Sequence, residues 1–257
     1  MFEWYYSFVF FFILHLIYMF VVKFHFHMWA AHKFVIFSPN LHKFFRIWLW
    51  LIYIWEPRIM TKKWAATHRK HHKLSDSKQD PHSPYNHSFL DSLRVLWHND
   101  HRSPYYISEK DINKYAPDVP EYNDKLEDIL IAYRSWRYFL FCSAFLLLFG
   151  IGGLIVGAVV YPIFIIESLA YNFLTHKYGY RNFVNHKSDQ SKNFWGFGFL
   201  WIGEEFQNNH HNQPGNMKFS VKWYEFDIGY AVIKILLYFG LAEILHNKDQ
   251  PDQKLTE

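Results

Sequence analysis

The sequence predicts an all-α fold: a bundle of integral membrane helices with a helical cap on its cytoplasmic side. Long uncharged apolar runs are the first observation, because a helix of about 20 apolar residues crosses a bilayer. Aromatic residues are the second, since they make up 22% of the chain and suit lipid contact and the membrane interface. The third is that many of the 17 histidines lie in polar segments beside these runs.

The first apolar run, Tyr5 to Val22, is about long enough for one crossing. Glu3 is the only charge before it, whereas basic residues follow it, so the positive-inside bias places the N-terminus outside. We expect a retained helix rather than a cleaved signal peptide, because a basic n-region is missing. The predicted single domain, 1–257, comprises membrane helices at about 4–24, 137–152 and 154–175, an interfacial helix at about 43–55, and a cytoplasmic cap of 56–135 and 176–250.

The interfacial helix is predicted from the run Phe44 to Trp55, which carries Arg46 and is too short to cross. The following polar segment, 60–133, shows weaker helical patterning around 89–97 and 122–131. We also expect an amphipathic helix over 224–245 that lies against the bilayer or the cap. The last ten residues have the composition of a solvated tail.

The run from Tyr138 to Leu174 is long enough for two tightly spaced crossings. Its glycines at 150, 152 and 153 mark a turn in one interpretation. In the other, Gly153 and Gly157 form a GxxxG pair that allows two helices to pack closely in lipid.

Composition excludes several kinds of site. A net charge of +4 on dispersed basic residues gives no support for nucleic-acid binding. Cys142 is the single cysteine and lies in an apolar run, so the chain forms no intramolecular disulfide and no cysteine-based metal site. Any metal must therefore be held by other side chains, and neutral imidazole is a good ligand for iron, zinc, copper and nickel.

Two histidine clusters have metal-ligand spacing. His68, His71 and His72 stand at positions i, i+3 and i+4, which share one face of a helix. One such cluster arises by chance in a histidine-rich surface segment. The second cluster, His210 and His211, repeats the spacing with Gln207 in the first position. Two clusters with the same spacing make a chance origin of the pattern less credible.

His27 and His32 follow the first membrane helix directly. On an ideal helix about 140° separates positions five apart, so these two side chains are not expected to form a clamp on one face. They reach two different metals, flank a bent helix end, or are interfacial aromatics that extend to water. His176 lies just past the third apolar run. All these histidines share one site only if an even number of crossings separates each pair.

Several linked motifs resemble the membrane fatty acid desaturase family, in the branch of stearoyl-CoA desaturase (the acyl-CoA Δ9 type) and its bacterial relatives. These motifs are HMWAAH at 27–32, THRKHHK at 67–73, HKYGYRNF at 176–183, GEEFQNNHH at 203–211 and KWYEFDIGY at 222–230. The resemblance covers nearly the whole chain and implies a di-iron centre. Its implied ligands are His27, His32, His68, His71, His72, His176, His210 and His211.

The same resemblance implies that Asn172 contacts one iron through water and that Trp64 lines an acyl tunnel, although core packing explains Trp64 equally well. Gln207 departs from the pattern, because this branch has histidine there, whereas front-end desaturases carry glutamine. An amide oxygen is a weaker ligand for iron than imidazole, so reduced metal occupancy is one expected consequence.

The implied reaction consumes O2 and two electrons and leaves a cis double bond in an acyl-CoA or acyl-lipid chain. No haem-domain, iron-sulfur or dinucleotide motif is present, so we expect a separate ferredoxin or cytochrome b5-like donor. We expect a multi-pass protein of a bacterial inner membrane, in contact with membrane lipids, with the metal site on the cytoplasmic side. Two alternatives stay open: a related di-iron hydroxylase or ketolase, and a non-catalytic descendant that Gln207 would mark.

Overall fold

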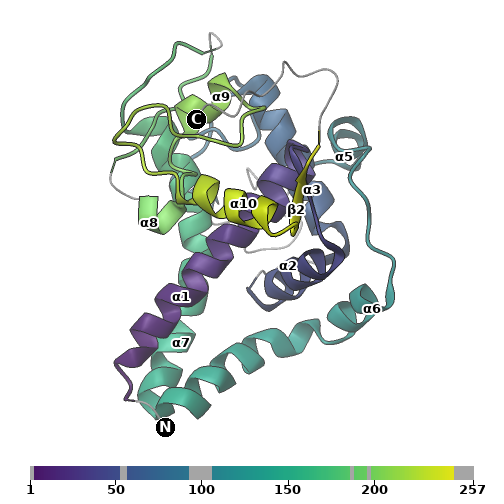
Figure 1. Ribbon diagram of the computed structural model, residues 1–257, viewed down its shortest axis with the longest axis vertical. Coiled ribbons are helices and arrows are strands. Elements are labelled where there is room, and N and C mark those ends of the chain that lie inside the picture. Colours follow the sequence, from purple (N-terminus) through teal and green to yellow (C-terminus); the bar gives the residue numbers. More distant parts are fainter. Residues whose placement is uncertain (1–2, 53–56, 93–105, 186–187, 196–197, 246–257) are drawn as a thin grey trace.

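The computed structural model describes residues 3–52, 57–92, 106–185, 188–195 and 198–245. The described chain is predominantly helical (Figure 1). Its elements are α1 (Tyr6–Val21), the π-helix η1 (Val22–Ala31), β1 (Val35–Phe37), α2 (Pro39–Ile52), α3 (Pro57–Leu74), α4 (Phe89–Ser92), α5 (Glu109–Tyr115), α6 (Lys125–Ala132), the 3-10 helix η3 (Arg134–Trp136), α7 (Arg137–Lys177), α8 (Gly198–Trp201), α9 (Gln207–Asn212), α10 (Ile228–Tyr238) and β2 (Ala242–Ile244).

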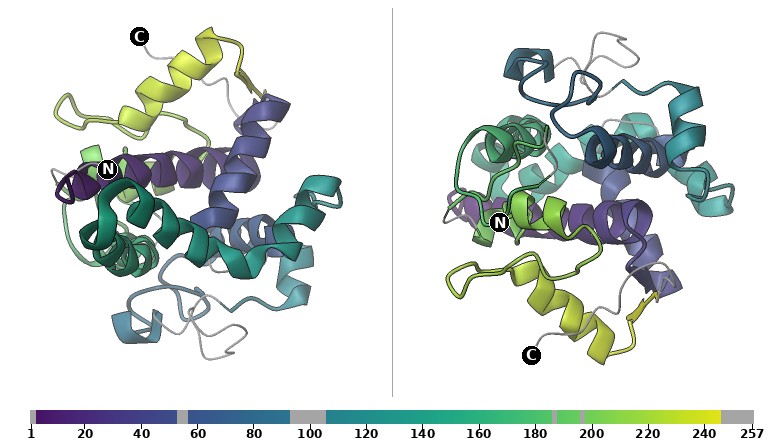
Figure 2. Two further views of the ribbon diagram at one scale, coloured as in Figure 1. Left: turned by 90° about the horizontal axis from the view of Figure 1, so that it is seen from below. Right: turned by 90° about the horizontal axis from the view of Figure 1, so that it is seen from above.

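Two helices in the described ranges are long and apolar enough to cross a membrane, Tyr6–Ala31 and Arg134–Ile163. The first covers most of the segment expected at 4–24 and continues beyond it, because the chain stays helical through η1. Its crossing of a membrane stays a prediction. α1 runs along the long axis of the molecule beside the second half of α7 (Figure 1). In Figure 2, α1 lies between α7 on one side and α10 on the other.

α7 is a hairpin of two helices that meet at Gly150. This residue has φ 69° and ψ −160°, a conformation that side-chain-bearing residues rarely adopt, and it reverses the chain. The two helices then pack so closely that a Cβ on Gly157 would lie 2.7 Å from Cγ of Phe145, and one on Gly153 would overlap Phe149. The turn and the close helix packing are therefore both present, and the lipid environment of that packing stays a prediction. The turn lies near the N-terminal end of α1, since Gly152 packs against Trp4 (Figure 1).

α2 confirms a helix where the interfacial one is expected, with bounds shifted to Pro39–Ile52, while 53–55 lie outside the described residues. Arg46 is buried and joins α2 to α6, because its guanidinium donates to Asp124 at 2.7 Å and to Glu127 at 2.8 Å. In the polar segment, α4 covers the start of the expected 89–97 pattern, and α6 covers most of the 122–131 pattern and extends to Ala132. Residues 93–97 lie outside the described ranges.

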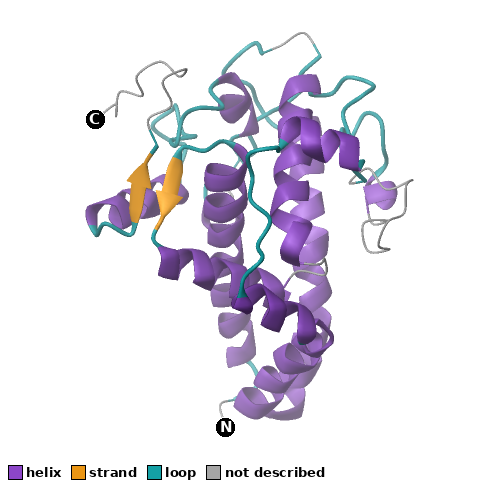
Figure 3. Cartoon of the chain, turned by 90° about the vertical axis from the view of Figure 1, so that its right-hand side faces the viewer, coloured by secondary structure: helices purple, strands orange, loops and turns teal. Residues whose placement is uncertain are grey.

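The all-α prediction needs one correction, because β1 and β2 form a two-stranded antiparallel sheet (Figure 3). Val35 pairs with Ile244 and Phe37 with Ala242. The helix expected over 224–245 is also too long, since α10 ends at Tyr238 and Gly240 turns the chain at φ 67° into β2. Hydrophobic periodicity carries no information on a strand partner about 200 residues away. The predicted tail lies outside the description from residue 246 onward.

Candidate metal centre

The structure brings all eight histidines singled out in the sequence to one end of the bundle. They come from the η1 end, from α3, from the last turn of α7 and from α9. Within each of two sets, the possible ligand atoms lie within 4.8 Å of one another. The five-histidine group consists of His27, His32, His68, His72 and His210, and the three-histidine group consists of His71, His176 and His211.

The π-helix explains why His27 and His32 belong to the same group. The backbone N–H of His32 donates to the carbonyl of His27 at 3.1 Å, an i→i+5 bond that the wider π turn allows. Their ring centroids lie 5.0 Å apart. The ideal α-helical geometry assumed for this segment was therefore wrong, and the prediction that the pair cannot act on one face is corrected.

The Nε2 atoms of the five-histidine group converge. His27 Nε2 lies 2.8 Å from His210 Nε2, and His32 Nε2 lies 3.0 Å from His68 Nε2. His72 Nε2 lies 2.9 Å from the Nε2 atoms of both His68 and His210. Nitrogen lone pairs gathered in this way form the donor set that a borderline transition-metal ion prefers.

In the three-histidine group, an aspartate holds the Nδ1 atom of each imidazole. The Nδ1 atoms of His71, His176 and His211 donate to Asp80 at 2.8 Å, Asp76 at 2.8 Å and Asp189 at 3.0 Å. Their Nε2 atoms are buried and have no hydrogen-bond partner within the described part of the chain. Since Nδ1 carries the hydrogen, each Nε2 lone pair faces the group. Carboxylates commonly orient metal-binding histidines in this way, so the residues fit a bound metal.

Electrostatics favour the protonation state that metal binding requires. Burial, and next the neighbouring imidazoles, hold the pKa values of His68, His72 and His210 well below the usual value. Burial also lowers the pKa of His211, to about 4. His71 differs: burial lowers its pKa, but the carboxylates of Asp80, Asp76 and Asp189 together outweigh burial and raise it. Neutral imidazoles are the ligand form.

The acidic partners were missed by the sequence analysis. Asp80 follows His71 by nine residues in a turn rich in Asp, Ser and Pro, so a local signal for it existed. Burial raises the pKa of each aspartate, but hydrogen bonds from the histidines outweigh it and lower the pKa values of Asp76, Asp80 and Asp189. Asp189 and Glu204 are brought in only by the tertiary fold. The carboxylate of Glu204 accepts from His27 Nδ1 at 2.6 Å.

The remaining sequence candidates lie around the two groups. Asn172 stands one turn before His176, and its side-chain amide donates to the carbonyl of His82 at 3.3 Å. Gln207 is buried at the start of α9, where its amide nitrogen donates to the carbonyl of Glu204 at 3.0 Å. The ring of Trp64 stacks on His68, with centroids 4.8 Å apart. Packing against a candidate ligand is therefore the role that its contacts support.

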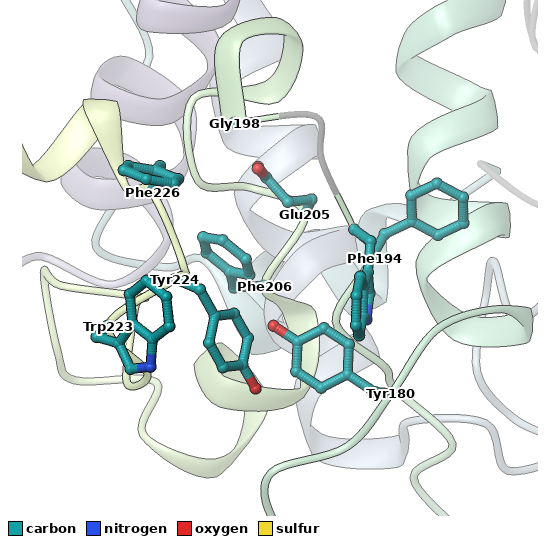
Figure 4. A pocket seen from close by; sticks show the side chains of 9 residues that line it. Tyr180, Phe194, Gly198, Glu205, Phe206, Trp223, Tyr224 and Phe226 are labelled. Carbon is teal, nitrogen blue, oxygen red and sulfur yellow. The ribbon is translucent and has the colours of Figure 1, made fainter.

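A separate pocket of about 530 Å³ opens beside the segment 202–206 between α8 and α9, called here the Glu204 loop (Figure 4). Aromatic side chains such as Phe206, Tyr224 and Phe226 surround it, and the side chain of Glu205 points into it. None of the eight histidines lines this pocket, and neither does Trp64. The acyl tunnel expected beside the metals therefore stays a prediction.

Comparison with known proteins identifies the family. The profile of the fatty acid desaturase family matches residues 3–244. The chain belongs to this family. Among similar desaturase-family proteins, the sn-1 stearoyl-lipid 9-desaturase of Synechocystis sp. is 31% identical over 188 residues, which cover 70% of this chain and 54% of that protein.

Two further relatives differ in the acyl carrier that their names state. The hex-5-enoyl-[acyl-carrier protein] acetylenase of Moorena producens is 29% identical over 205 residues, covering 70% of this chain and 59% of that protein. An acyl-CoA 5-desaturase of Anemone leveillei is 32% identical over 185 residues, covering 70% and 54%. The chain therefore spans little more than half the length of the relatives it matches.

Proposed function

We propose that this desaturase-family chain is an O2-dependent fatty acyl desaturase that holds two iron ions, one in each histidine group, and introduces a cis double bond. The observation that carries the proposal is the convergence of eight imidazoles into two adjacent groups, in which carboxylates hold the Nδ1 atoms of His27, His71, His176 and His211. His71 and His72 are neighbours in the chain and belong to different groups, which supports a pair of sites close together.

The reaction is a balanced oxidation. A –CH2–CH2– unit, O2, two electrons and two protons give –CH=CH– and two molecules of water. Side chains alone do not oxidise an unactivated methylene, and bound iron supplies the O2 chemistry. The residues of this chain hold the ligand nitrogens and exclude water, since His27, His71 and His210 are almost fully buried.

The substrate is a long acyl chain on a lipid or on CoA. The names of the relatives include an acyl-lipid enzyme and an acyl-CoA enzyme, which supports both carriers. The electrons come from a separate ferredoxin or cytochrome b5-like protein, because oxidation by O2 here needs two electrons from outside the substrate. Membrane lipids surround α1 and α7.

The topology follows from the same proposal. α1 and the two halves of α7 cross a bacterial inner membrane, with the N-terminus outside and the histidines on the cytoplasmic side. The turn at Gly150 lies near Trp4, at the opposite end of α1 from His27, which supports two crossings within α7. Single cysteines tested in a Cys142→Ser background at Lys73 and Gln213, both exposed near the histidines, should label from the cytoplasm. Labelling of the two from opposite sides would rule out a shared site.

Product analysis tests the activity. Expression in a host that lacks its own desaturase should add monounsaturated acyl chains to the lipids, and purified protein should contain about two iron ions per chain. Hydroxylated chains in place of unsaturated ones would identify the hydroxylase alternative. Absence of both products from an iron-loaded protein supplied with electrons would refute the proposal.

A non-catalytic descendant is the second candidate, and Gln207 is the observation that favours it. The three-histidine group has only three imidazoles where the other has five. Weak metal retention in that group, with activity that appears only after Gln207→His, would support this candidate. Activity of the natural sequence excludes it.

A further inference from the structure

A buried lysine lies beside the five-histidine group, although the donor set needs no cation. Lys23 stands on η1 four residues before His27 and is fully buried. Its Nζ donates to the carbonyl of Ile202 at 3.1 Å and to Oδ1 of Asp227 at 3.1 Å. It also lies 3.6 Å from Oε1 of Glu204.

Glu204 connects this lysine to a candidate metal ligand. One carboxylate oxygen faces the ammonium of Lys23, and the other accepts the Nδ1 hydrogen of His27 at 2.6 Å. Both Lys23 and Glu204 have fully buried side chains. A buried carboxylate without a cation is costly, because desolvation is repaid only by close pairing and by hydrogen bonds. The position of Glu204 therefore depends on Lys23.

Two glycines beside Lys23 leave room for its side chain. A Cβ on Gly203 would lie 2.9 Å from Nζ, and one on Gly229 would overlap Cδ and Cε of Lys23. The ring of Phe219 covers the ammonium, with Nζ 4.2 Å from its centroid. The same ring packs against His210 at 4.4 Å between centroids. The ammonium of Lys23 is thus enclosed by glycine backbone, by the Phe219 ring and by two carboxylates, next to the candidate metal ligands.

Asp227 anchors the other side of the ammonium. Its Oδ2 accepts from the backbone N–H of Phe219 at 2.7 Å, and its Oδ1 accepts from that of Tyr230 at 2.8 Å, which caps α10. Lys23 therefore joins three segments that are distant in sequence: η1, the Glu204 loop and the start of α10.

We propose that Lys23 is a positioning residue for the five-histidine group, and that it acts through Glu204 to hold His27 with its Nε2 atom facing the metal. The inference rests on the proposed metal centre. A purely structural role would predict lower stability without a specific loss at the metal site, so the two roles are separable by measurement.

The test compares Lys23→Met with Arg46→Met in the full-length chain purified in detergent. Methionine keeps most of the length of lysine and removes its charge. Arg46 is a matched control, because it is also a buried cation held by two carboxylates, those of Asp124 and Glu127. Both proteins carry His176→Ala as well, which disables the three-histidine group. Metal-depleted protein is titrated with Co2+, whose visible absorption reports the coordination of the remaining group.

We expect Lys23→Met to weaken Co2+ binding roughly 10- to 100-fold and to change the absorption spectrum. Arg46→Met should lower the unfolding temperature and leave both quantities unchanged. Equal affinity and an equal spectrum for Lys23→Met would overturn the inference. Failure of the His176→Ala parent to bind Co2+ would instead count against the proposed metal centre.

A second variant covers the case in which Lys23→Met does not fold. Glu204→Gln keeps an amide oxygen that accepts from His27 and needs no neighbouring cation. The double variant Lys23→Met/Glu204→Gln should therefore fold and bind Co2+ more tightly than protein with Glu204→Ala. If it folds but binds no better than protein with Glu204→Ala, Lys23 does not act through Glu204, and the inference fails.

Discussion

His71 donates its Nδ1 hydrogen to Asp80 at 2.8 Å, and this bond determines which ring nitrogen faces the three-histidine group. Asp80 is held in turn by the backbone N–H groups of Asp76 at 2.8 Å and His82 at 3.1 Å. The turn after α3 is thus a support for a ligand on α3. Losing this support frees the imidazole to rotate or to change its tautomer.

We predict that Asp80→Asn lowers the metal affinity of the three-histidine group by roughly 10- to 100-fold. Metal titration of the depleted protein measures this directly. Asp111→Asn is the control, because Asp111 forms a partly exposed ion pair with Lys70 at 2.8 Å, and such pairs contribute little to stability. Unchanged affinity in Asp80→Asn would show that the carboxylate does not orient His71.

His71→Ala should abolish unsaturated products and leave membrane insertion intact, since the side chain belongs to the three-histidine group and does not face lipid. Gas chromatography of total fatty acids measures the first effect, and membrane fractionation measures the second. His87→Ala is a suitable comparison, because His87 belongs to neither histidine group and its loss should leave the product profile as it was. Full activity of His71→Ala would contradict its assignment as a ligand.

Gln207→His should tighten metal binding at the three-histidine group. Gln207 begins α9 three and four residues before His210 and His211, so an imidazole there shares their helical face. Iron per chain after dialysis against a weak chelator is the measurement. The control is Asn212→His on the same short helix. A gain equal to that of the control would indicate non-specific binding by added histidine.

Gly157→Leu should destabilise the α7 hairpin by about 1–3 kcal/mol, because the new side chain overlaps the ring of Phe145. Denaturant unfolding in detergent gives the free energy. Val159→Leu adds apolar volume at a position that is 60% exposed and should change stability little. Equal stability of the two variants would mean that the helices of the hairpin do not pack closely at Gly157.

Local pattern was sufficient for part of this architecture. The His68, His71 and His72 spacing predicts a helical face, and α3 has it. The sequence contains no comparable signal for the π turn that unites His27 with His32, because periodicity assumes a regular helix. Glu204 lies 177 residues from His27 and Asp189 lies 22 residues from His211, so only tertiary packing makes each pair partners. Local sequence pattern does not predict the β1–β2 pairing, for the same reason.

His42 gives the protein a specific sensitivity to acid. Its ring packs against Trp29, with centroids 4.5 Å apart, and burial together with the nearby Arg46 lowers its pKa to about 4. The unfolded chain has the ordinary value near 6.5. Between these two pH values the unfolded state binds more protons, so the free energy of unfolding falls as the pH drops from about 6.5 towards 4.

His42→Phe keeps an aromatic ring and removes the titration. We predict that its unfolding temperature falls less than that of the natural sequence between pH 6.5 and pH 4, and that the two pH profiles run parallel above pH 7. Thermal unfolding in detergent across this range measures both parts. Parallel profiles down to pH 4 would show that the pKa of His42 is the same in the folded and unfolded protein, and hence that Trp29 and Phe37 do not shield its ring from water.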